Sequence, residues 1–416
     1  MSTDTGSRQG FASSISALAT RAGDAVRHWP WWLQVSALYV AARLVSAGIF
    51  VAAARHQGTN PWFPAKPDYW NFINIWDARW YGEVISNGYP AVLPVDAAGN
   101  VQENAWAFYP LFPFLGGALS ALTGIAPEAS LALIAMFSGL MAALVLYSLF
   151  RHRVPHGTAM WAVAFFATFP VSGILQVPYA EPLTILLLGA ALLLLVRRQY
   201  YLAMPVVLLM SLSRPVGVPF AAMVGVLFIC RLVQRGRGEQ DSQVHSRREL
   251  GALAGLTAVS GAAALIWPAA AWAATGDIEA YTKTETVWRG HDLVPFKPWF
   301  DTGMQLFGPV LGVVAPFVFA GLFTLMLFSP PVLKLGVELR LWCACYMGYL
   351  LLFLHPQTST FRMLLPLFPL ALAAAVLSRS KAYRGTVIVM FVILQIVWIV
   401  WLWAWAQLPG GGDYPP

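Results

Sequence analysis

An acidic residue and two arginines, in three separate short motifs, are the residues of this chain best suited to chemistry. Asp77 lies in "WDARWY", Arg214 in "LSRPVG" and Arg362 in "HPQTSTFR". A carboxylate can take a proton from a hydroxyl group, and a guanidinium binds phosphate through two parallel N–H groups. The set suits group transfer from a phosphate-linked donor, because the phosphate leaves as a stabilised anion and only the attacking hydroxyl must lose a proton.

Further polar residues are expected close to Asp77, near a boundary of the membrane. Ionisable groups are costly there and usually have a role. A substrate could contact seven of them: Arg79, Tyr109, Tyr179, Glu181, Trp288, Arg289 and His355. Taken singly, each is explained equally well as a helix cap or as a side chain that reaches the interface. Asp77 could also do no more than cap a helix. The hypothesis of a site therefore depends on the set as a whole.

Several classes of chemistry lack their motifs in this chain. The sequence has no Walker loop, GxGxxG, HExxH, CxxC or GxSxG pattern, which disfavours ATP-driven, redox and zinc-protease functions. Glycoside hydrolysis normally needs an acid in addition to a base or nucleophile, whereas transfer from a phosphate-linked sugar needs only the base. No cofactor is expected. A single aspartate without a neighbouring carboxylate offers too few oxygen ligands to hold a divalent ion tightly, although assistance by such an ion stays open.

The composition predicts the elements that carry these residues. Of the 416 residues, 58% are hydrophobic and only 11% are charged, whereas about a quarter are charged in soluble domains. Apolar runs of roughly 20 residues match a hydrocarbon core about 30 Å thick. Eleven spans are predicted, at 32–54, 128–150, 156–172, 180–196, 200–213, 215–234, 250–274, 303–328, 336–354, 361–377 and 385–407. The chain is therefore expected to be a polytopic membrane protein without a nucleic-acid partner.

The basic residues decide the orientation of these spans, because cytoplasmic loops carry the excess of Lys and Arg. A twelfth apolar stretch, 107–124, would leave basic loops on both sides if it crossed the membrane. If it lies along the outer surface, every strongly basic loop falls inside. We therefore expect a cytoplasmic tail (1–29), one transmembrane domain (30–408) with external loops at 55–127 and 275–302, and an external tail (409–416).

The segment around Asp77 is predicted to form an amphipathic helix on the outer membrane surface. Trp76, Trp80, Val84 and Ile85 recur at helical spacing on one face. Tryptophans at an interface are more often anchors in the headgroup layer than platforms for a substrate. Asp77 would lie in the first turn, where the helix dipole favours a carboxylate. Arg43, inside the first span, would pair with a carboxylate or a carbonyl group.

Four blocks of this sequence resemble the PIG-V family of membrane mannosyltransferases and its bacterial relatives, within the GT-C glycosyltransferase superfamily. They are "WDARWYGEVISNGYP", "FYPLFPFL", "FPVSGILQVPYAEPLTILLLGAALLLL" and "LSRPVG", in this order. The resemblance covers roughly residues 30–380. It implies that Asp77 is the catalytic aspartate, that Tyr179 and Glu181 match a "Y-S-E-S" motif, and that Arg214 is the family's arginine. Ala180 and Pro182 stand in place of the motif's serines, and the acceptor stays open.

Residues and resemblance together lead to one expectation, an all-α GT-C-like bundle of about 11 transmembrane helices in the bacterial cytoplasmic membrane. It would transfer mannose, with inversion, from a polyprenyl-phosphate-mannose donor to a hydroxyl of a lipid or glycan on the outer face. Asp77 would be the general base. Arg214, Arg362 and Arg289 would hold the phosphate, while Tyr109, Glu181, Trp288 and His355 would position the sugars.

Two alternatives of other classes remain. A transporter or flippase of lipids or lipid-linked sugars would move its substrate without chemistry, although such proteins commonly show duplicated halves and polar residues at the membrane midplane. A structural membrane subunit would have no need for Asp77.

Overall fold

The computed structural model describes residues 28–236, 246–288, 293–407 and 416, and this part of the chain consists of helices and the loops that join them, without a strand. The helices of the first half are α2 (Trp31–Ala54), α3 (Tyr69–Ile73), α4 (Asp77–Asn87), η1 (Ala105–Ala107), α5 (Leu111–Thr123), α6 (Pro127–Arg151), α7 (His156–Thr168), η2 (Ser172–Gln176), α8 (Glu181–Val196) and α9 (Tyr200–Ser211). Those of the second half are α10 (Gly217–Gly236), α11 (Arg247–Thr275), α12 (Ala280–Val287), α13 (Lys297–Leu327), α14 (Pro330–Leu333), α15 (Gly336–Phe353), α16 (Thr360–Met363), η3 (Leu365–Leu367), α17 (Pro369–Leu377), α18 (Lys381–Val397) and η4 (Trp398–Trp403). The predicted all-α fold is confirmed.

Seven of the described helices are long and apolar enough to cross a membrane. The number rises to eight if the bent pair Thr360–Leu367 and Pro369–Leu377, which turns by 73°, forms one span. Each of the eleven predicted spans contains a helix, but several are short, such as α9 with 12 residues. The chain is a multi-pass membrane protein, and the count of eleven stays a prediction.

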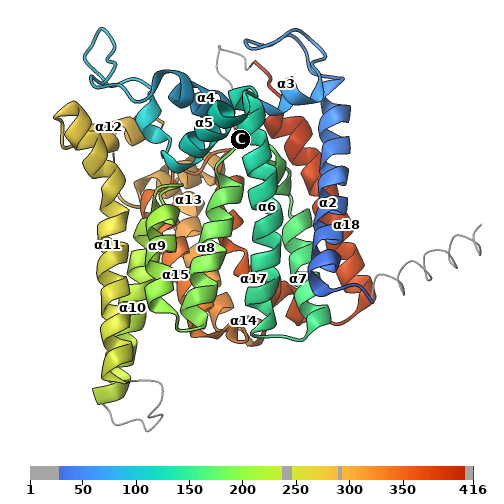
Figure 1. Ribbon diagram of the computed structural model, residues 1–416, viewed down its shortest axis with the longest axis vertical. Coiled ribbons are helices and arrows are strands. Elements are labelled where there is room, and N and C mark those ends of the chain that lie inside the picture. Colours follow the sequence, from blue (N-terminus) through green and yellow to red (C-terminus); the bar gives the residue numbers. More distant parts are fainter. Residues whose placement is uncertain (1–27, 237–245, 289–292, 408–415) are drawn as a thin grey trace, which may run out of the picture.

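The two ends of the bundle differ in what they carry. Helices α3, α4, α5 and α12 lie together at one end, and α14 lies at the other (Figure 1). The segment 107–124, which we predicted not to cross the membrane, contains α5 with 13 residues. At 1.5 Å per residue this helix spans about 20 Å, less than a hydrocarbon core. It packs on α4 and α6 at the end that carries Asp77.

Small residues let the central helices approach closely. Helices α6 and α8 share the most extensive contact of the bundle. A Cβ atom added to Gly189 of α8 would lie 3.0 Å from the Leu146 side chain of α6. Ala142 and Ala143 of α6 are fully buried. Close packing of this kind replaces the hydrophobic effect as the main source of helix association in lipid, so the position of Glu181 at the start of α8 is firmly set.

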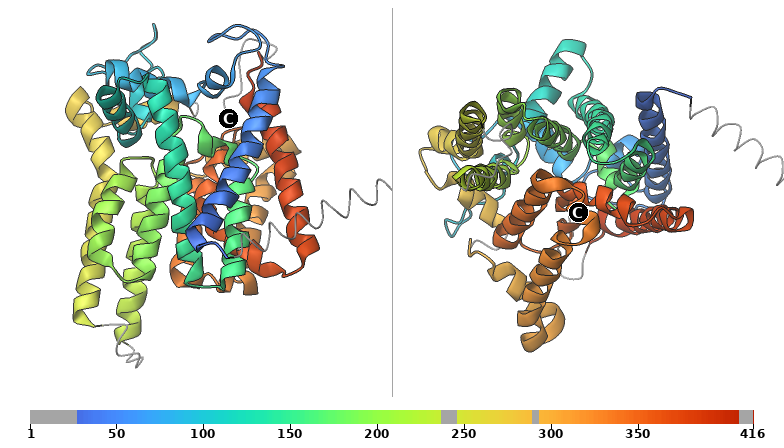
Figure 2. Two further views of the ribbon diagram at one scale, coloured as in Figure 1. Left: turned by 45° about the vertical axis from the view of Figure 1, so that its right-hand side comes forward. Right: turned by 90° about the horizontal axis from the view of Figure 1, so that it is seen from below.

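The predicted span at 303–328 contains a break, because α13 is a helical hairpin. Gly308 lies inside it with φ 77° and ψ 176°, which breaks the helix. The Trp299 and Phe319 rings stack at 5.7 Å, so the chain folds back on itself. A Cβ atom on Gly303 would come within 2.4 Å of the Gly312 carbonyl oxygen, which shows how closely the two arms cross. Seen from below, the hairpin extends away from the rest of the bundle (Figure 2).

Arg43 binds carbonyl groups, one of the two kinds of partner predicted for it. Its guanidinium donates hydrogen bonds to the carbonyl oxygens of Ala167 and Ser172, and to the Ser172 hydroxyl at 3.0 Å. Among the described residues no ion pair of Arg43 with a carboxylate is found. The arginine thus fixes α2 against the turn between α7 and η2 and has a structural role.

Candidate functional site

Two short helices hold Asp77 in place. The Asp68 side chain caps α3 by accepting a hydrogen bond from the Asn71 N–H at 2.8 Å, and α4 begins at Asp77, as predicted. Between them, Trp76 has φ 59°, a value that costs a residue other than glycine roughly 1–3 kcal/mol and is found most often at functional sites. The Trp76 indole N–H donates to the Trp403 carbonyl oxygen at 2.8 Å. This contact secures the strained turn that precedes Asp77.

Asp77 belongs to a four-residue ionic cluster with Glu181, Arg214 and Arg362, which we call the Asp77 cluster. Arg362 Nη1 lies 2.5 Å from Asp77 Oδ2 and 3.0 Å from Glu181 Oε1. Arg214 Nη2 lies 3.4 Å from Asp77 Oδ2 and forms a second ion pair with Glu181 Oε1. Two carboxylates and two guanidiniums give the cluster a formal charge of zero. Its members lie up to 285 positions apart in the sequence.

Each member of the cluster comes from a different element. Asp77 starts α4, Glu181 starts α8, Arg214 lies in the connection between α9 and α10, and Arg362 lies in α16. Four chain segments therefore meet at one point. Because the side chains of all four are at most 15% exposed, solvent screens their attraction only weakly.

Tyr179 contacts two members of the cluster. Its hydroxyl accepts a hydrogen bond from the Asp77 backbone N–H at 3.1 Å, and the Arg362 guanidinium lies 5.4 Å from the centre of its ring. Burial raises the pKa of Tyr179 well above the ordinary value, and the Asp77 charge acts in the same direction. The phenol therefore keeps its proton and holds the first turn of α4 against η2 and α8.

Some hydrogen-bonding capacity of the cluster is unused. Within the described residues, Glu181 Oε2, Arg214 Nε and Arg362 Nε are buried without a partner. A buried polar atom without a partner costs roughly 1–3 kcal/mol. These three atoms leave one acceptor and two donors that a polar ligand could satisfy.

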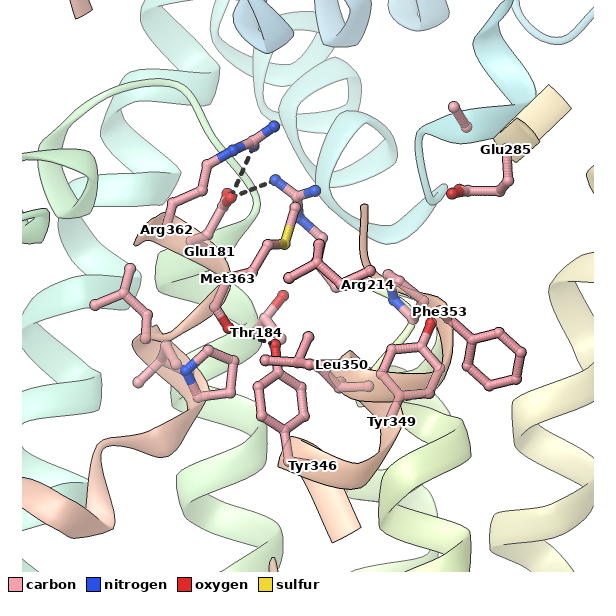
Figure 3. A pocket seen from close by; sticks show the side chains of 17 residues that line it. Glu181, Thr184, Arg214, Glu285, Tyr346, Tyr349, Leu350, Phe353, Arg362 and Met363 are labelled. Carbon is pink, nitrogen blue, oxygen red and sulfur yellow. Dashed lines mark hydrogen bonds and ion pairs between the residues drawn. The ribbon is translucent and has the colours of Figure 1, made fainter. Parts of the chain in front are cut away.

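A cavity of about 100 Å³ adjoins the cluster, and its lining changes character from one side to the other. Glu181, Arg214 and Arg362 form the charged side, as Figure 3 shows. The rest is largely aromatic and apolar, with Tyr346, Tyr349, Leu350, Phe353 and Leu354 of α15 and the residue after it. Such a cavity suits a ligand with an anionic head and an apolar body.

Three predicted site residues lie outside the Asp77 cluster. Tyr109 shares a hydrogen bond with the Tyr281 hydroxyl at 3.0 Å and packs with Trp267. Trp288 stands edge-on to Trp80, 6.0 Å between ring centres, with a buried indole N–H that has no partner in the described structure. His355 directly follows Leu354, the cavity residue after the end of α15, and its buried Nδ1 also lacks a partner there.

The two other predicted arginines are not part of the cluster. Arg79 is exposed on the opposite face of α4, where it lines two surface clefts. Arg289 lies outside the described residues. Only Arg214 and Arg362, among the residues predicted to hold a phosphate, are brought together.

Most residues of the cavity wall were not predicted from the sequence. Thr184 lies one helical turn after Glu181 on α8, and Tyr346 and Tyr349 lie one turn apart on α15. Polar side chains spaced by one turn inside an apolar span are the signal that would have found them, because such residues usually face the bundle interior. Glu285, which also lines the cavity, comes from α12 on the far side (Figure 3).

The structure differs from two expectations, one about Asp77 and one about Trp76. Glu181 shares both guanidiniums with Asp77, so the premise that Asp77 has no neighbouring carboxylate is wrong. Both carboxylates are engaged by arginine, and no group of three or more His, Cys, Asp or Glu side chains suited to a metal ion occurs in the part of the chain described. Trp76 is only 7% exposed and packs against Trp62, so it does not anchor the helix in lipid.

No family model matches the chain, and no curated protein sequence matches it. The chain resembles two solved structures of an oligosaccharyltransferase from Archaeoglobus fulgidus. A complex with Zn and sulfate has 16% sequence identity and a TM-score of 0.47 over 87% of this chain and 53% of that one. A complex of the archaeal oligosaccharyltransferase AglB with an inhibitory peptide and a dolichol-phosphate has 15% identity and a TM-score of 0.43, over 88% and 55%.

The chain thus spans about half the length of these structures. The function is inferred from the Asp77 cluster and the cavity beside it.

Proposed function

We propose that this protein is a membrane glycosyltransferase, an inverting mannosyltransferase that uses a polyprenyl-phosphate-mannose donor, with a lipid or glycan hydroxyl as acceptor. The observation that carries the proposal is the Asp77 cluster at the charged side of an otherwise aromatic and apolar cavity. The sequence resemblance to the PIG-V family points to the same reaction. The site would face the extracytoplasmic side, as the distribution of basic loops predicts.

In the proposed reaction Asp77 is the general base. The acceptor hydroxyl attacks the anomeric carbon of the donor from the face opposite the phosphate, and its proton passes to the Asp77 carboxylate. The bond between the anomeric carbon and the phosphate oxygen breaks, and polyprenyl phosphate leaves with the electron pair. One base and a stabilised leaving group suffice, so the reaction needs no general acid.

The arginines would bind and stabilise that leaving phosphate. Arg214 and Arg362 are held about a common point by Glu181, which contacts both. Their buried Nε–H groups have no partner among the described residues, so each retains a donor for a phosphate oxygen. A phosphate would also compete with Asp77 for the guanidiniums, and this competition would release the carboxylate to accept a proton.

The apolar part of the cavity suits the donor's hydrocarbon chain. Tyr349 and Phe353 of α15 and the adjacent Leu354 provide aromatic and aliphatic surface next to the arginines. Glu181, Tyr109, Trp288 and His355 remain candidates to position the sugars. Of these, Glu181 lines the cavity, and His355 directly follows Leu354 in the sequence.

The test is a transfer assay on purified protein in nanodiscs with polyprenyl-phosphate-[14C]mannose and a crude lipid extract. We expect a labelled product and release of polyprenyl phosphate with the wild type, and neither with Asp77→Asn. Equal product from both proteins would refute the catalytic role of Asp77. Movement of the donor across the bilayer without any product would instead identify a transporter.

A further inference from the structure

A groove of about 680 Å³ runs along the surface of the bundle, between α2 and the segment formed by α18 and η4. Helices α2 and α18 lie side by side at one edge of the bundle in both Figure 1 and Figure 2. We call this feature the α2–η4 groove. Among the described residues it shares none with the cavity beside Arg214 and Arg362, so the two are separate features.

The wall on α2 is a stripe that follows one face of the helix and ends just beyond it. Its members recur at helical spacing: Val45, Gly48, Ile49, Ala52, Ala53 and His56. A Cβ atom on Gly48 would meet nothing within 4 Å, so the groove is open at this point. Val45 and His56 are eleven positions apart, which at roughly 1.5 Å per residue is about 16 Å, or about half of a hydrocarbon core about 30 Å thick. The groove therefore has the length of an acyl chain in one leaflet.

Hydrogen bonds between the two walls fix the groove at both ends. At the deep end, Ser46 Oγ and Gln395 Oε1 are in hydrogen-bond contact at 2.8 Å. At the other end, the Gln57 amide donates to the Trp405 carbonyl oxygen and accepts from the Trp405 N–H, both at 3.0 Å. These contacts set the spacing of the walls, and binding to a preformed groove avoids part of the cost of ordering.

The surface of the α2–η4 groove is apolar over most of its length. On the side of α18 and η4, Val400 is 55% exposed and Trp401 is 72% exposed. Apolar side chains exposed on a membrane span face hydrocarbon, and tryptophans are enriched where the hydrocarbon meets the head groups. The interior of the groove therefore suits a hydrocarbon chain.

The end of the groove at His56 carries positive charge. Arg55 and Lys66 are both exposed there, and the Lys66 N–H donates to the Gln57 carbonyl oxygen at 2.9 Å. No carboxylate lines the groove within the described part of the chain, and the side chain of Asp68, the nearest in the sequence, caps α3. Basic side chains at a membrane surface attract anionic lipids. An anionic head group is therefore favoured at this end.

We propose that the α2–η4 groove binds a phospholipid with an anionic head group, drawn from the leaflet next to Asp77. One acyl chain would lie along the stripe from His56 to Val45, and the phosphate would lie beside Arg55 and Lys66. The site is independent of the proposed function, because it uses no residue of the Asp77 cluster or of the cavity beside it.

Native mass spectrometry of the full chain, released from nanodiscs with equal amounts of dioleoyl phosphatidylglycerol and dioleoyl phosphatidylcholine, tests the site. We expect the wild type to retain phosphatidylglycerol in preference to phosphatidylcholine. Gly48→Leu should retain about tenfold less of it, because the new side chain takes the place of at least two CH₂ groups of the bound chain. Gly321→Leu in α13 is the matched control and should retain the lipid, since a Cβ atom on Gly321 also meets nothing within 4 Å.

A second variant tests the head group. Arg55→Gln should lower the preference for phosphatidylglycerol over phosphatidylcholine about fivefold, the usual contribution of one basic residue at a membrane surface. Arg79→Gln is its control and should keep the preference, because Arg79 is also exposed but does not line the groove. This comparison leaves the groove itself intact, so it decides the question even if Gly48→Leu does not fold.

Three results would overturn the proposal. Equal retention of phosphatidylglycerol by Gly48→Leu and the wild type would refute the groove as the site. Equal retention of the two lipids by the wild type would refute the anionic head group. Displacement of phosphatidylglycerol by an equal amount of added polyprenyl phosphate would assign the groove to that lipid instead. None of these measurements depends on sugar transfer, so the site and the proposed function stand or fall separately.

Discussion

Two ionic networks lie at opposite ends of the bundle. They contain similar residues, but only one of them has a hydrogen-bond partner for every buried polar side-chain atom. The Asp77 cluster joins two carboxylates and two guanidiniums. At the end that carries α14, Arg231 contacts Glu249 at 3.0 Å and Glu338 at 3.3 Å, and Arg153 contacts Glu338 at 2.9 Å. We call this second set the Arg231 network. The side chain of Arg231 is 8% exposed, the same value as for Arg362.

The two networks differ in the number of buried polar atoms that lack a hydrogen-bond partner. In the Arg231 network the Tyr200 hydroxyl donates to Glu249 at 3.1 Å, and no buried side-chain nitrogen or oxygen of Arg231, Glu249 or Glu338 lacks a partner in the described chain. The Asp77 cluster leaves three such atoms unpaired and borders a cavity. Burial and pairing alone therefore do not mark a functional site. The proposed function of the Asp77 cluster depends on its unpaired hydrogen-bonding atoms and on the cavity beside them.

The largest expected effect is that of Asp77→Asn on transfer. The amide keeps the size of the side chain and can still contact the arginines, but it cannot accept the proton. We expect the rate of transfer to fall by about 10²- to 10⁴-fold, the usual contribution of a general base. Product formation from labelled donor at saturating concentration measures this. A loss of less than about tenfold would mean that Asp77 positions a substrate and does not accept the proton.

A smaller loss is expected when one arginine of the Asp77 cluster becomes a lysine. Arg362→Lys keeps the charge but removes the planar fork that contacts Asp77, Glu181 and a phosphate together. We expect kcat/KM for the donor to fall by roughly 10- to 100-fold, which corresponds to one or two charge-assisted hydrogen bonds. Arg340→Lys, in α15 near the opposite end, is the control and should keep wild-type activity.

The Arg231 network should affect stability and not transfer. Glu338→Gln removes the charge that both Arg153 and Arg231 contact. Loss of one partner of a buried ion pair costs up to about 3–5 kcal/mol, and less for side chains that are partly exposed. We expect a lower thermal midpoint in nanodiscs and an unchanged turnover per folded molecule. A change in kcat with an unaltered midpoint would remove the contrast between the two networks.

The smallest effect on transfer is expected in the α13 hairpin, which does not line the cavity. Gly303→Ala would place a methyl group within 2.4 Å of the Gly312 carbonyl oxygen, whereas a Cβ atom on Gly321 meets nothing within 4 Å. Gly303→Ala should therefore lower the thermal midpoint and Gly321→Ala should not, with transfer little changed in either. Equal midpoints for the two variants would show that the arms of the hairpin are not packed as described.

The sequence predicts the helices better than the site, because apolar runs and charged loops are local signals. The end of the long apolar run marks the end of α2 at Ala54, and Asp77 was placed at the start of its helix. The α13 hairpin escaped prediction since its apolar pattern is continuous. The "FGP" at 307–309 is the local sign of the break. Gly308 takes a positive φ there, which is unfavourable for residues other than glycine.

The site itself depends on contacts across long stretches of chain. Asp77, Glu181, Arg214 and Arg362 were each singled out for chemical type and for a position near one membrane boundary. The sequence could not show that Glu181 would share both guanidiniums with Asp77, because that requires α8 and α16 to pack beside α4. Nor could it separate Arg79 from the other arginines, since one turn of α4 decides which side a residue faces.

The most direct test of the central claim is a cryo-EM structure of the protein in nanodiscs with a non-transferable polyprenyl-phosphonate analogue of the mannose donor. We predict that the phosphonate lies between Arg214 and Arg362, with its hydrocarbon chain along Tyr349 and Phe353 and its anomeric carbon next to Asp77. Density for the phosphonate at the Arg231 network, or anywhere out of reach of Arg362, would contradict the account.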